Sequence, residues 1–229
     1  MSQKMKIVAA KEAIKYVKNN MKLGLGTGST VDEFLKLLST EVKNGLDIFG
    51  VVTSEKTKVL SESLGIPLTT LSNVKDLDLT IDGADEIDPD LSLIKGGGGA
   101  LLREKIIAYN SKELIIIADK TKLVSKLGDF TIPVEVSPYE HQATSSRIIQ
   151  KLDEIGYNGS IKLRQDKDNV FITDGGNFIY DISIGLVGEP YIIEQLLNTI
   201  PGVFENGLFI NLTTKVIIGD EDKAEVIEK

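Results

Sequence analysis

Two glycine-rich segments, GLGTGST at 24–30 and KGGGGALLREK at 95–105, contain residues that could bind an anion. In the first segment an apolar run ends, and Ser29 or Thr30 is the predicted N-cap of a helix. The free N–H groups and positive dipole end of such a helix suit a phosphate, and the hydroxyls of Thr27, Ser29 and Thr30 add donors. A dinucleotide fingerprint would need glycine in place of Ser29, and a P-loop would need Gly-Lys, so both nucleotide sites are excluded. A phosphate site and a plain strand-to-helix turn both stay open.

A predicted strand at 77–81 runs directly into the acidic sequence DGADEID at 82–88. Asp82 follows the carboxyl end of that strand, where it could face a cleft and shuttle protons. Alternatively, Asp82 and Asp85 hydrogen-bond backbone amides in an acidic turn, which is the commoner arrangement of aspartate beside glycine. A hard, oxygen-ligated cation such as magnesium is a third interpretation, although no histidine lies nearby.

Lys95 precedes four glycines that lead into a predicted helix. The backbone N–H groups of such a run, beside an ammonium, suit a developing oxyanion. Glu104 lies just over one turn into the helix and is flanked by apolar residues, which makes it a candidate acid or base. The alternative is that 103–105 is an ordinary charged stretch. Lys6 and Lys122 could supply positive charge to an anion or could be solvated.

The elements that must position these residues alternate between strands and helices over the first 130 residues. The predicted strands are 22–25, 48–52, 67–71, 77–81 and 114–118, and the predicted helices cover 5–17 and begin near 29, 54 and 100. This alternation is typical of a mostly parallel sheet with helices on both faces, whose ligands bind beyond the carboxyl ends of the strands. A strand at 215–218 could return to this sheet, followed by a solvated charged tail at 220–229.

The pattern changes near Phe130 and predicts a second, smaller domain. Its predicted elements are strand 131–136, helix 139–155, strands 161–164, 170–173 and 178–182, helix 190–199 and strand 208–210. This succession has a ferredoxin-like order. We therefore predict a sheet domain formed by 1–130 and 207–229, and a smaller α+β domain at 131–206.

The composition of the 229 residues excludes several chemistries. There is no cysteine, so thiolate catalysis, disulfides and cysteine-ligated metals are excluded. The single histidine, His141, cannot form an HExxH site and is interpreted as structural or surface, so acid–base chemistry falls to Asp, Glu and Lys. The formal net charge of -8 argues against nucleic acid or an anionic membrane as a partner. The apolar stretch at 7–10 is too short for a secretory signal and no run approaches ~18 apolar residues, which predicts a cytoplasmic protein.

Four segments, GLGTGST, DGADEID, KGGGGALLREK and IADKTK, occur in this order and at separations that together are highly specific. The combination resembles the ribose-5-phosphate isomerase A family, and the resemblance runs through nearly the whole chain, including TDGGN in the second domain. It implies a Rossmann-like sheet domain with a smaller ferredoxin-like α+β domain. It also implies interconversion of ribose 5-phosphate and ribulose 5-phosphate through an enediol, with no metal and no cofactor.

Carried over motif by motif, the resemblance places the catalytic base on Glu104, an acid–base aspartate on Asp82 and the oxyanion-stabilising lysine on Lys95, with Asp85 in the same site. The implied substrate contacts are Thr27, Gly28, Ser29, Thr30, Asp82, Gly83, Ala84, Asp85, Lys95, Gly96, Gly97, Gly98, Lys122 and, as a looser match, Lys6. The resemblance assigns no role to Arg164. It suggests a homodimer or homotetramer.

Two other functions stay open at this point. A CoA-transferase of similar architecture would use Glu104 as a nucleophile that forms an acyl thioester, and it should need a larger cleft. A non-catalytic sugar-phosphate sensor would carry a DNA-binding module, for which the 23 residues before Gly24 are too few.

Overall fold

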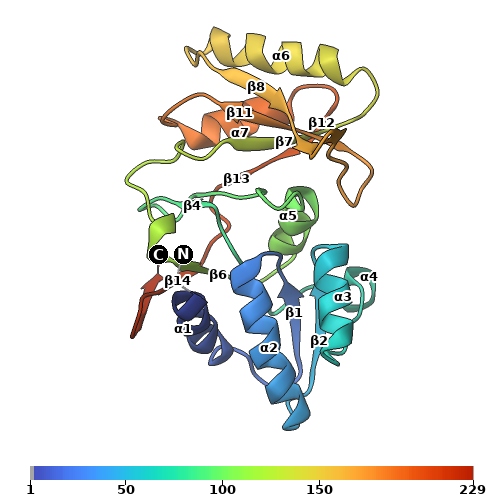
Figure 1. Ribbon diagram of the computed structural model, residues 1–229, viewed down its shortest axis with the longest axis vertical. Coiled ribbons are helices and arrows are strands. Elements are labelled where there is room, and N and C mark those ends of the chain that lie inside the picture. The colour runs from blue at the N-terminus through green and yellow to red at the C-terminus, as the bar shows by residue number, and fades with distance from the viewer. Residues whose placement is uncertain (1–2, 229) are drawn as a thin grey trace. The chain divides into compact units, whose positions relative to one another are not determined.

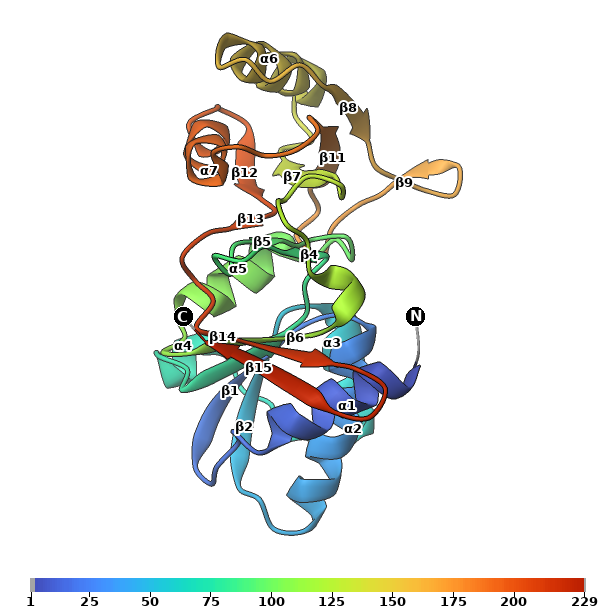
Figure 2. The ribbon, with the colours of Figure 1, turned by 90° about the vertical axis from the view of Figure 1, so that its left-hand side faces the viewer.

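Most of the apolar runs expected as strands in the first half of the chain pair into one six-stranded sheet in the computed structural model, which describes residues 3–228 (Figure 1). The sheet order is β15-β14-β6-β3-β1-β2. Its strands are β1 (Met21–Leu25), β2 (Ile48–Val52), β3 (Leu79–Asp82), β6 (Leu114–Asp119), β14 (Lys215–Gly219) and β15 (Ala224–Glu228). All neighbours are parallel except β14 and β15, which lie side by side in antiparallel register (Figure 2). The expected return of 215–218 to this sheet is confirmed, and the tail forms its edge strand.

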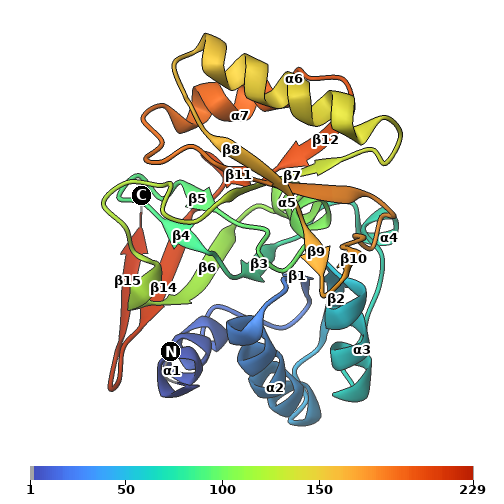
Figure 3. The same ribbon diagram turned by 45° about the horizontal axis from the view of Figure 1, so that its top comes forward.

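Helices cover both faces of this sheet, as the alternating pattern predicts. The helices are α1 (Gln3–Ile14), α2 (Ser29–Lys43), α3 (Glu55–Ser63), α4 (Leu71–Val74) and α5 (Leu101–Tyr109). On one face, α1 and α2 lie side by side (Figure 3) and bury small alanines and large apolar residues against Leu23 and Leu25 of β1. On the other face, Ile107 of α5 packs over Gly24, where a Cβ would lie 2.7 Å from the isoleucine methyl. Successive residues of β1 point to opposite faces, so a glycine at 24 gives α5 its close approach.

The strand order reverses beside β1. From β1 the chain proceeds to β2 on one side, whereas from β3 it proceeds to β6 on the other side. In open α/β sheets, ligands bind in the crevice outside the carboxyl ends of the strands where such a reversal occurs. The loops after β1 and β3 therefore occupy the expected ligand-binding edge of this sheet.

The second unit contains a four-stranded antiparallel sheet of order β12-β7-β11-β8. Its elements follow the chain as β7 (Ile132–Val136), α6 (His141–Glu154), β8 (Ser160–Leu163), β11 (Phe178–Ser183), α7 (Pro190–Asn198) and β12 (Val203–Asn206). This βαββαβ succession, with the first strand between the third and fourth, is ferredoxin-like. The predicted fold class is thus confirmed for both sheets.

Three predicted strands differ in the structure. Segment 67–71 makes only an isolated bridge, between Leu68 and Gly50, before α4 begins. The strand at 170–173 shortens to β10 (Asn169–Val170), which pairs with β9 (Gln165–Asp166) in a small hairpin. The ferredoxin-like sheet is completed by β12, while β13 (Leu208–Phe209) pairs with β5 (Leu93–Ile94) instead. The strand β12 has the sequence VFEN, in which Phe204 is exposed and two of the four residues are polar. It therefore lacks the apolar run by which the other strands were predicted.

The contacts group the chain differently from the predicted boundaries. One unit contains the residues up to 84, 103–123 and those from 211, and the other contains 85–102 and 124–210. Segment 85–102 groups with the second unit because β5 pairs with both β4 (Glu86–Ile87) and β13, and the Lys95 amide donates to the Gly207 carbonyl at 2.8 Å. Short pairings between distant segments give no periodic signal in a sequence.

Candidate active site

The loop after β1 leads straight into α2 without a side-chain cap. Gly28, with φ of 135°, occupies the N-cap position, and the helix begins at Ser29. The predicted N-cap at Ser29 or Thr30 is therefore wrong: the chain turns through a φ that favours glycine, and both hydroxyl residues fall within the first helical turn. The leading amides of α2 keep the donor character that suits an anion.

Lys6 lies beside this helix start. Its Nζ donates to Ser29 Oγ at 2.7 Å, which joins α1 to the first turn of α2. The structure thus brings together two of the predicted substrate contacts that are 23 positions apart in sequence. The Lys6 ammonium thus lies beside the positive end of the α2 dipole, and both favour an anion.

The acidic turn after β3 is held against the loop after β1. Asp82 is only 1% exposed, and its Oδ1 accepts the amides of Thr27 at 3.1 Å and Gly83 at 2.7 Å. The amide of Gly26 donates to the Ile81 carbonyl at 2.9 Å. A Cβ on Gly26 would lie 2.1 Å from Asp82 Oδ1, so only glycine permits this approach. Asp82 therefore does hydrogen-bond backbone amides, as one of the interpretations expected, and these bonds fix its carboxylate at the edge of the sheet where ligands are expected to bind.

Three hydroxyl groups that the sequence analysis did not select gather around Thr27 beside the same loop. Thr27 Oγ1 lies within 2.7–3.0 Å of the side-chain oxygens of Thr53, Ser54 and Thr57. Thr57 Oγ1 also donates to the Gly26 carbonyl at 2.8 Å, and Ser54 caps α3 by accepting the Thr57 amide. Thr53 and Ser54 directly follow β2, the sheet neighbour of β1, so the strand order could have indicated that they belong to this edge.

Glu104 lies in the first turn of α5 and is 4% exposed. The helix runs antiparallel to β1 and β3, since Ser111, just beyond its end, bridges to Leu77 before β3, and Ser111 Oγ lies 2.6 Å from Thr80 Oγ1. Glu104 precedes Ile107 by three residues and so shares its face, about 4.5 Å further along the axis. Because Ile107 packs on Gly24, this places Glu104 toward the carboxyl ends of β1 and β3.

Lys122 ends the 3-10 helix Lys120–Lys122, which directly follows β6. Asp119 caps this turn by accepting the Thr121 amide at 3.0 Å. Because β6 is the parallel neighbour of β3, the turn begins at the same edge of the sheet as Asp82. Lys122 is half-buried there.

The second unit holds the other predicted residues. Lys95 is 2% exposed and follows β5, with its Nζ 5.3 Å from the centre of the Phe209 ring. The Gly97 amide donates to Asp85 Oδ2 at 2.8 Å, so Asp85 binds the start of the glycine run. Gly96 and Gly99 have positive φ, and Gly97 and Gly98 are exposed. The structure therefore brings Asp85 and the glycine run together within this unit.

His141, interpreted from the sequence as structural or surface, contacts aromatic residues of the second unit. Its Nδ1 lies 2.8 Å from the Tyr180 hydroxyl, and its ring meets the edge of Phe178 at 5.0 Å. Among residues 3–228, no group of three or more potential ligands from His, Cys, Asp and Glu is placed to hold a metal ion. The helices of this range include none that is long and apolar enough to cross a membrane.

Comparison with known proteins identifies the family. The family model for ribose 5-phosphate isomerase A (phosphoriboisomerase A) matches residues 49–223. Ribose-5-phosphate isomerase A of Rhodopseudomonas palustris is 50% identical over 96% of both chains, and that of Bartonella bacilliformis is 46% identical over 100% of this chain and 98% of its own. The chain belongs to the ribose 5-phosphate isomerase A family. The isomerase interconverts ribose 5-phosphate and ribulose 5-phosphate, which confirms the predicted activity.

Solved structures agree with this assignment. A D-ribose-5-phosphate isomerase in complex with phospho-erythronic acid superposes with a TM-score of 0.93 at 42% identity, with both chains fully covered. The ribose 5-phosphate isomerase from Plasmodium falciparum gives a TM-score of 0.94 at 36% identity, covering 100% of this chain and 99% of its own. The isomerase assignment takes precedence over the CoA-transferase and sensor interpretations, because these full-length relatives carry the isomerase name.

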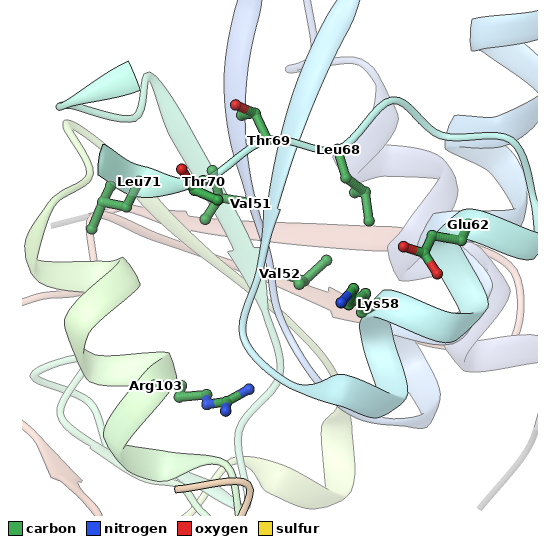
Figure 4. Close-up of a pocket in the computed structure, with 9 residues that line it drawn as sticks. All are labelled: Val51, Val52, Lys58, Glu62, Leu68, Thr69, Thr70, Leu71 and Arg103. Atoms are coloured by element: carbon green, nitrogen blue, oxygen red, sulfur yellow. The ribbon is translucent and has the colours of Figure 1, made fainter. Parts of the chain in front are cut away.

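The isomerase also has a cavity of about 460 Å³ beside β2. Figure 4 shows its lining, which comes from β2, α3, the segment 68–71 and Arg103 of α5. Arg103 Nη1 donates to Glu55 of α3 at 3.0 Å. None of the predicted substrate contacts lines this cavity, which lies at the opposite side of β2 from β1.

Proposed function

We propose that Glu104 is the general base of the isomerisation and that it carries one proton between C2 and C1 of the open-chain sugar. In the forward direction the Glu104 carboxylate removes the proton from C2, and the C1 carbonyl oxygen takes up the electron pair and then a proton. The resulting enediol loses the proton of its C2 hydroxyl, and C1 receives the proton held by Glu104. One hydrogen moves between neighbouring carbons with no net oxidation, so the step needs no redox cofactor.

The observation that carries this role is the placement of a buried carboxylate on the face of α5 that packs on β1. Glu104 is 4% exposed, and its face is fixed by Ile107 over Gly24. A carboxylate withdrawn from water in a fixed orientation suits proton transfer at carbon, because general bases act through accurate positioning as well as basicity.

Lys95 and the amides that follow it are proposed to stabilise the negative charge on the oxygens of the enediolate. Lys95 is 2% exposed, and Gly97 and Gly98 present an exposed backbone free of side chains. Preorganised donors at a developing oxyanion each contribute about 3 kcal/mol in other enzymes. Gly98 precedes Glu104 by six residues within the same KGGGGALLREK motif.

Asp82 and Asp85 are proposed to open the furanose ring and to move hydroxyl protons. Each carboxylate has one oxygen held by backbone amides. Asp82 accepts the amides of Thr27 and Gly83, and Asp85 accepts the amide of Gly97. The two carboxylates are three residues apart in sequence, which limits the separation of their Cα atoms to about 11 Å. Gly83 and Ala84, between them, are proposed to contact the sugar through the backbone.

The phosphate is proposed to bind at the start of α2. The uncapped amides around Gly28, the hydroxyls of Thr27, Ser29 and Thr30, and the ammonium of Lys6 support this assignment. Lys122, at the same edge of the sheet, is proposed to add a second cation. Phospho-erythronic acid, the ligand of the structural relative, has a carboxylate whose paired oxygens resemble those of the enediolate, and we infer that it occupies the same site here.

The remaining expectations concern the assembly and the setting of the enzyme. The family resemblance predicts a homodimer or homotetramer, which light scattering after size-exclusion chromatography would measure. The charge of -8 predicts no nucleic-acid partner, and a cytoplasmic location stays a prediction. The reaction predicts activity without a metal or cofactor, so overnight dialysis against a chelator should leave the turnover unchanged.

The proposal is tested by Glu104→Gln with ribose 5-phosphate deuterated at C2. The amide cannot accept the proton, so kcat should fall about 10²- to 10⁴-fold, with loss of deuterium from C2 slowed equally. The matched control is Glu154→Gln, at the exposed end of α6, which should behave as wild type. Retention of normal turnover and normal deuterium loss by a folded Glu104→Gln enzyme would remove Glu104 from the mechanism.

A further inference from the structure

Arg164, to which the sequence analysis gave no role, binds the carbonyl side of the glycine run. Its Nη1 donates to the carbonyl oxygens of Gly96 at 2.8 Å and Gly97 at 3.3 Å. All three residues belong to the second unit. Arg164 directly follows β8, so a strand of the ferredoxin-like sheet supplies a side chain to the loop that carries Lys95.

The guanidinium is itself held firmly. Its Nε donates to Asp181 Oδ2 at 2.9 Å and its Nη2 pairs with Asp181 Oδ1, which makes a bidentate ion pair with β11. The Arg164 and Asp181 side chains are 13% and 22% exposed. A planar, bidentate arginine is a rigid donor, because the fork geometry removes most of its rotational freedom.

Peptide geometry converts these contacts into an orientation of the amides. In a trans peptide the C=O and N–H bonds point in opposite directions, and the described residues contain no cis peptide. Because Arg164 binds the carbonyls of Gly96 and Gly97, the N–H groups of Gly97 and Gly98 point away from it. The Gly97 N–H is the one that donates to Asp85 Oδ2. One side chain thus sets the direction of two loop amides and, through the first of them, holds Asp85.

Phe171 supports the same loop from a second position. Its ring lies 5.8 Å from the Arg164 guanidinium carbon, and a Cβ on Gly99 would lie 2.3 Å from the ring. The Phe171 amide donates to the Arg164 carbonyl at 3.0 Å, which joins the two side chains through the backbone. A glycine run has little conformational preference of its own, so its shape depends on such external contacts.

We propose that Arg164 is a positioning residue for the isomerisation, which acts by aiming the amides of the glycine run and orienting Asp85. The inference rests on the proposed roles of Lys95, Asp85 and these amides. It adds a function for the second unit, whose ferredoxin-like sheet would supply the rigid support of the oxyanion-binding loop. Arg164 itself need not touch the substrate.

The test compares Arg164→Ala, Arg164→Lys and Asp181→Asn with Arg147→Ala, an exposed arginine of α6 in the same unit. Loss of the loop orientation should lower kcat/KM about 10- to 100-fold in Arg164→Ala, mainly through kcat. Arg164→Lys keeps the charge but cannot bridge Asp181 and two carbonyls, so it should restore only part of the activity. Added guanidinium at low millimolar concentration should partly rescue Arg164→Ala, whereas it should not affect Arg147→Ala. If Arg164→Ala does not fold, Asp181→Asn still tests the inference, with an expected loss of about 3- to 10-fold.

A double-mutant cycle separates positioning from a merely structural role. In a Lys95→Ala background, Arg164→Ala should cause less than a threefold further loss, because both act through one loop. Full additivity, or wild-type kcat/KM in the folded single variant, would overturn the inference. If Lys95→Ala and Glu104→Gln themselves keep normal turnover, the proposed function fails. If they lose turnover while Arg164→Ala does not, only the role of Arg164 fails.

Discussion

Gly26 and Gly83 both adjoin Asp82, yet the structure leaves room for a methyl group at only one of them. A Cβ on Gly26 would lie 2.1 Å from Asp82 Oδ1, 2.4 Å from its Cγ and 2.7 Å from its Cα. A Cβ on Gly83 would meet only carbonyl oxygens, of Thr27 at 3.9 Å and Ile117 at 4.0 Å. Ordinary carbon contacts are about 3.5–4.0 Å, so Gly26→Ala must shift backbone by about 1 Å, whereas Gly83→Ala need not shift it at all.

Overpacking of this kind costs about 1–3 kcal/mol. For a chain of this size we expect Gly26→Ala to lower the melting temperature by roughly 2–12 °C. A displacement of about 1 Å at Asp82 or at the proposed phosphate-binding loop should also lower kcat/KM about 10²-fold. Gly83→Ala should melt within about 2 °C of wild type. The added methyl group makes no clash, and alanine lowers the conformational entropy of the unfolded chain.

Circular dichroism melts and an isomerase assay at 25 °C would measure both effects. The melts show whether each variant is folded at 25 °C, so a loss of turnover in a folded variant reflects the site. A Gly26→Ala protein that melts and turns over as wild type would show that the loops after β1 and β3 do not touch as described. An equal fall in melting temperature in Gly83→Ala would show that the clash is not the cause of the destabilisation.

Three further substitutions test other parts of the structure. Hydrogen bonds from the Lys112 ammonium and the Lys22 amide lower the pKa of Asp78, so its ion pair stabilises the fold at neutral pH. This contribution is complete above the ordinary carboxyl pKa of about 4 and is lost as the pH falls through the lowered pKa. Asp78→Asn should therefore lose about 1 kcal/mol in urea unfolding at pH 7, and progressively less as the pH falls below about 4. Glu86 is 3% exposed, and its carboxylate accepts the backbone amides of Gly128 and Phe130. In Glu86→Gln the side-chain NH₂ would face one of these N–H donors, so the free energy of unfolding in urea should fall by about 2–4 kcal/mol. His141→Asn should lose about 1 kcal/mol with its tyrosine contact and leave kcat/KM unchanged, and a large loss of turnover there would contradict its structural role.

The elements with strong apolar patterns were predictable from the sequence. The buried strands β1, β3 and β6 and the amphipathic helix α2 follow from runs or periods of apolar residues, and the motifs located the loops between them. Chain order also allowed the ferredoxin-like succession to be predicted. What these elements share is that the determining signal is local, since each pattern lies within the element that it specifies.

The parts that could not be predicted depend on pairing between distant segments. The two-residue strands β4, β5 and β13 exist only because they pair with one another, and they transfer segment 85–102 to the second unit. The hydroxyl groups of Thr53, Ser54 and Thr57 join the site because β2 neighbours β1, which the sequence does not state. Asp82 could be selected as a candidate site residue from the sequence, but the identity of the amides that hold its carboxylate could not.

The glycine run shows why a motif alone cannot specify a functional loop. Four consecutive glycines supply N–H donors free of side chains, but they also leave the backbone the largest choice of conformations. The direction of those donors therefore has to be imposed by residues outside the motif. In this chain Arg164 binds the carbonyl side, Asp85 accepts the first amide and Phe171 packs against the end of the run. Because the run itself carries no conformational preference, substitutions 60 or more positions away should alter the loop as strongly as substitutions within it.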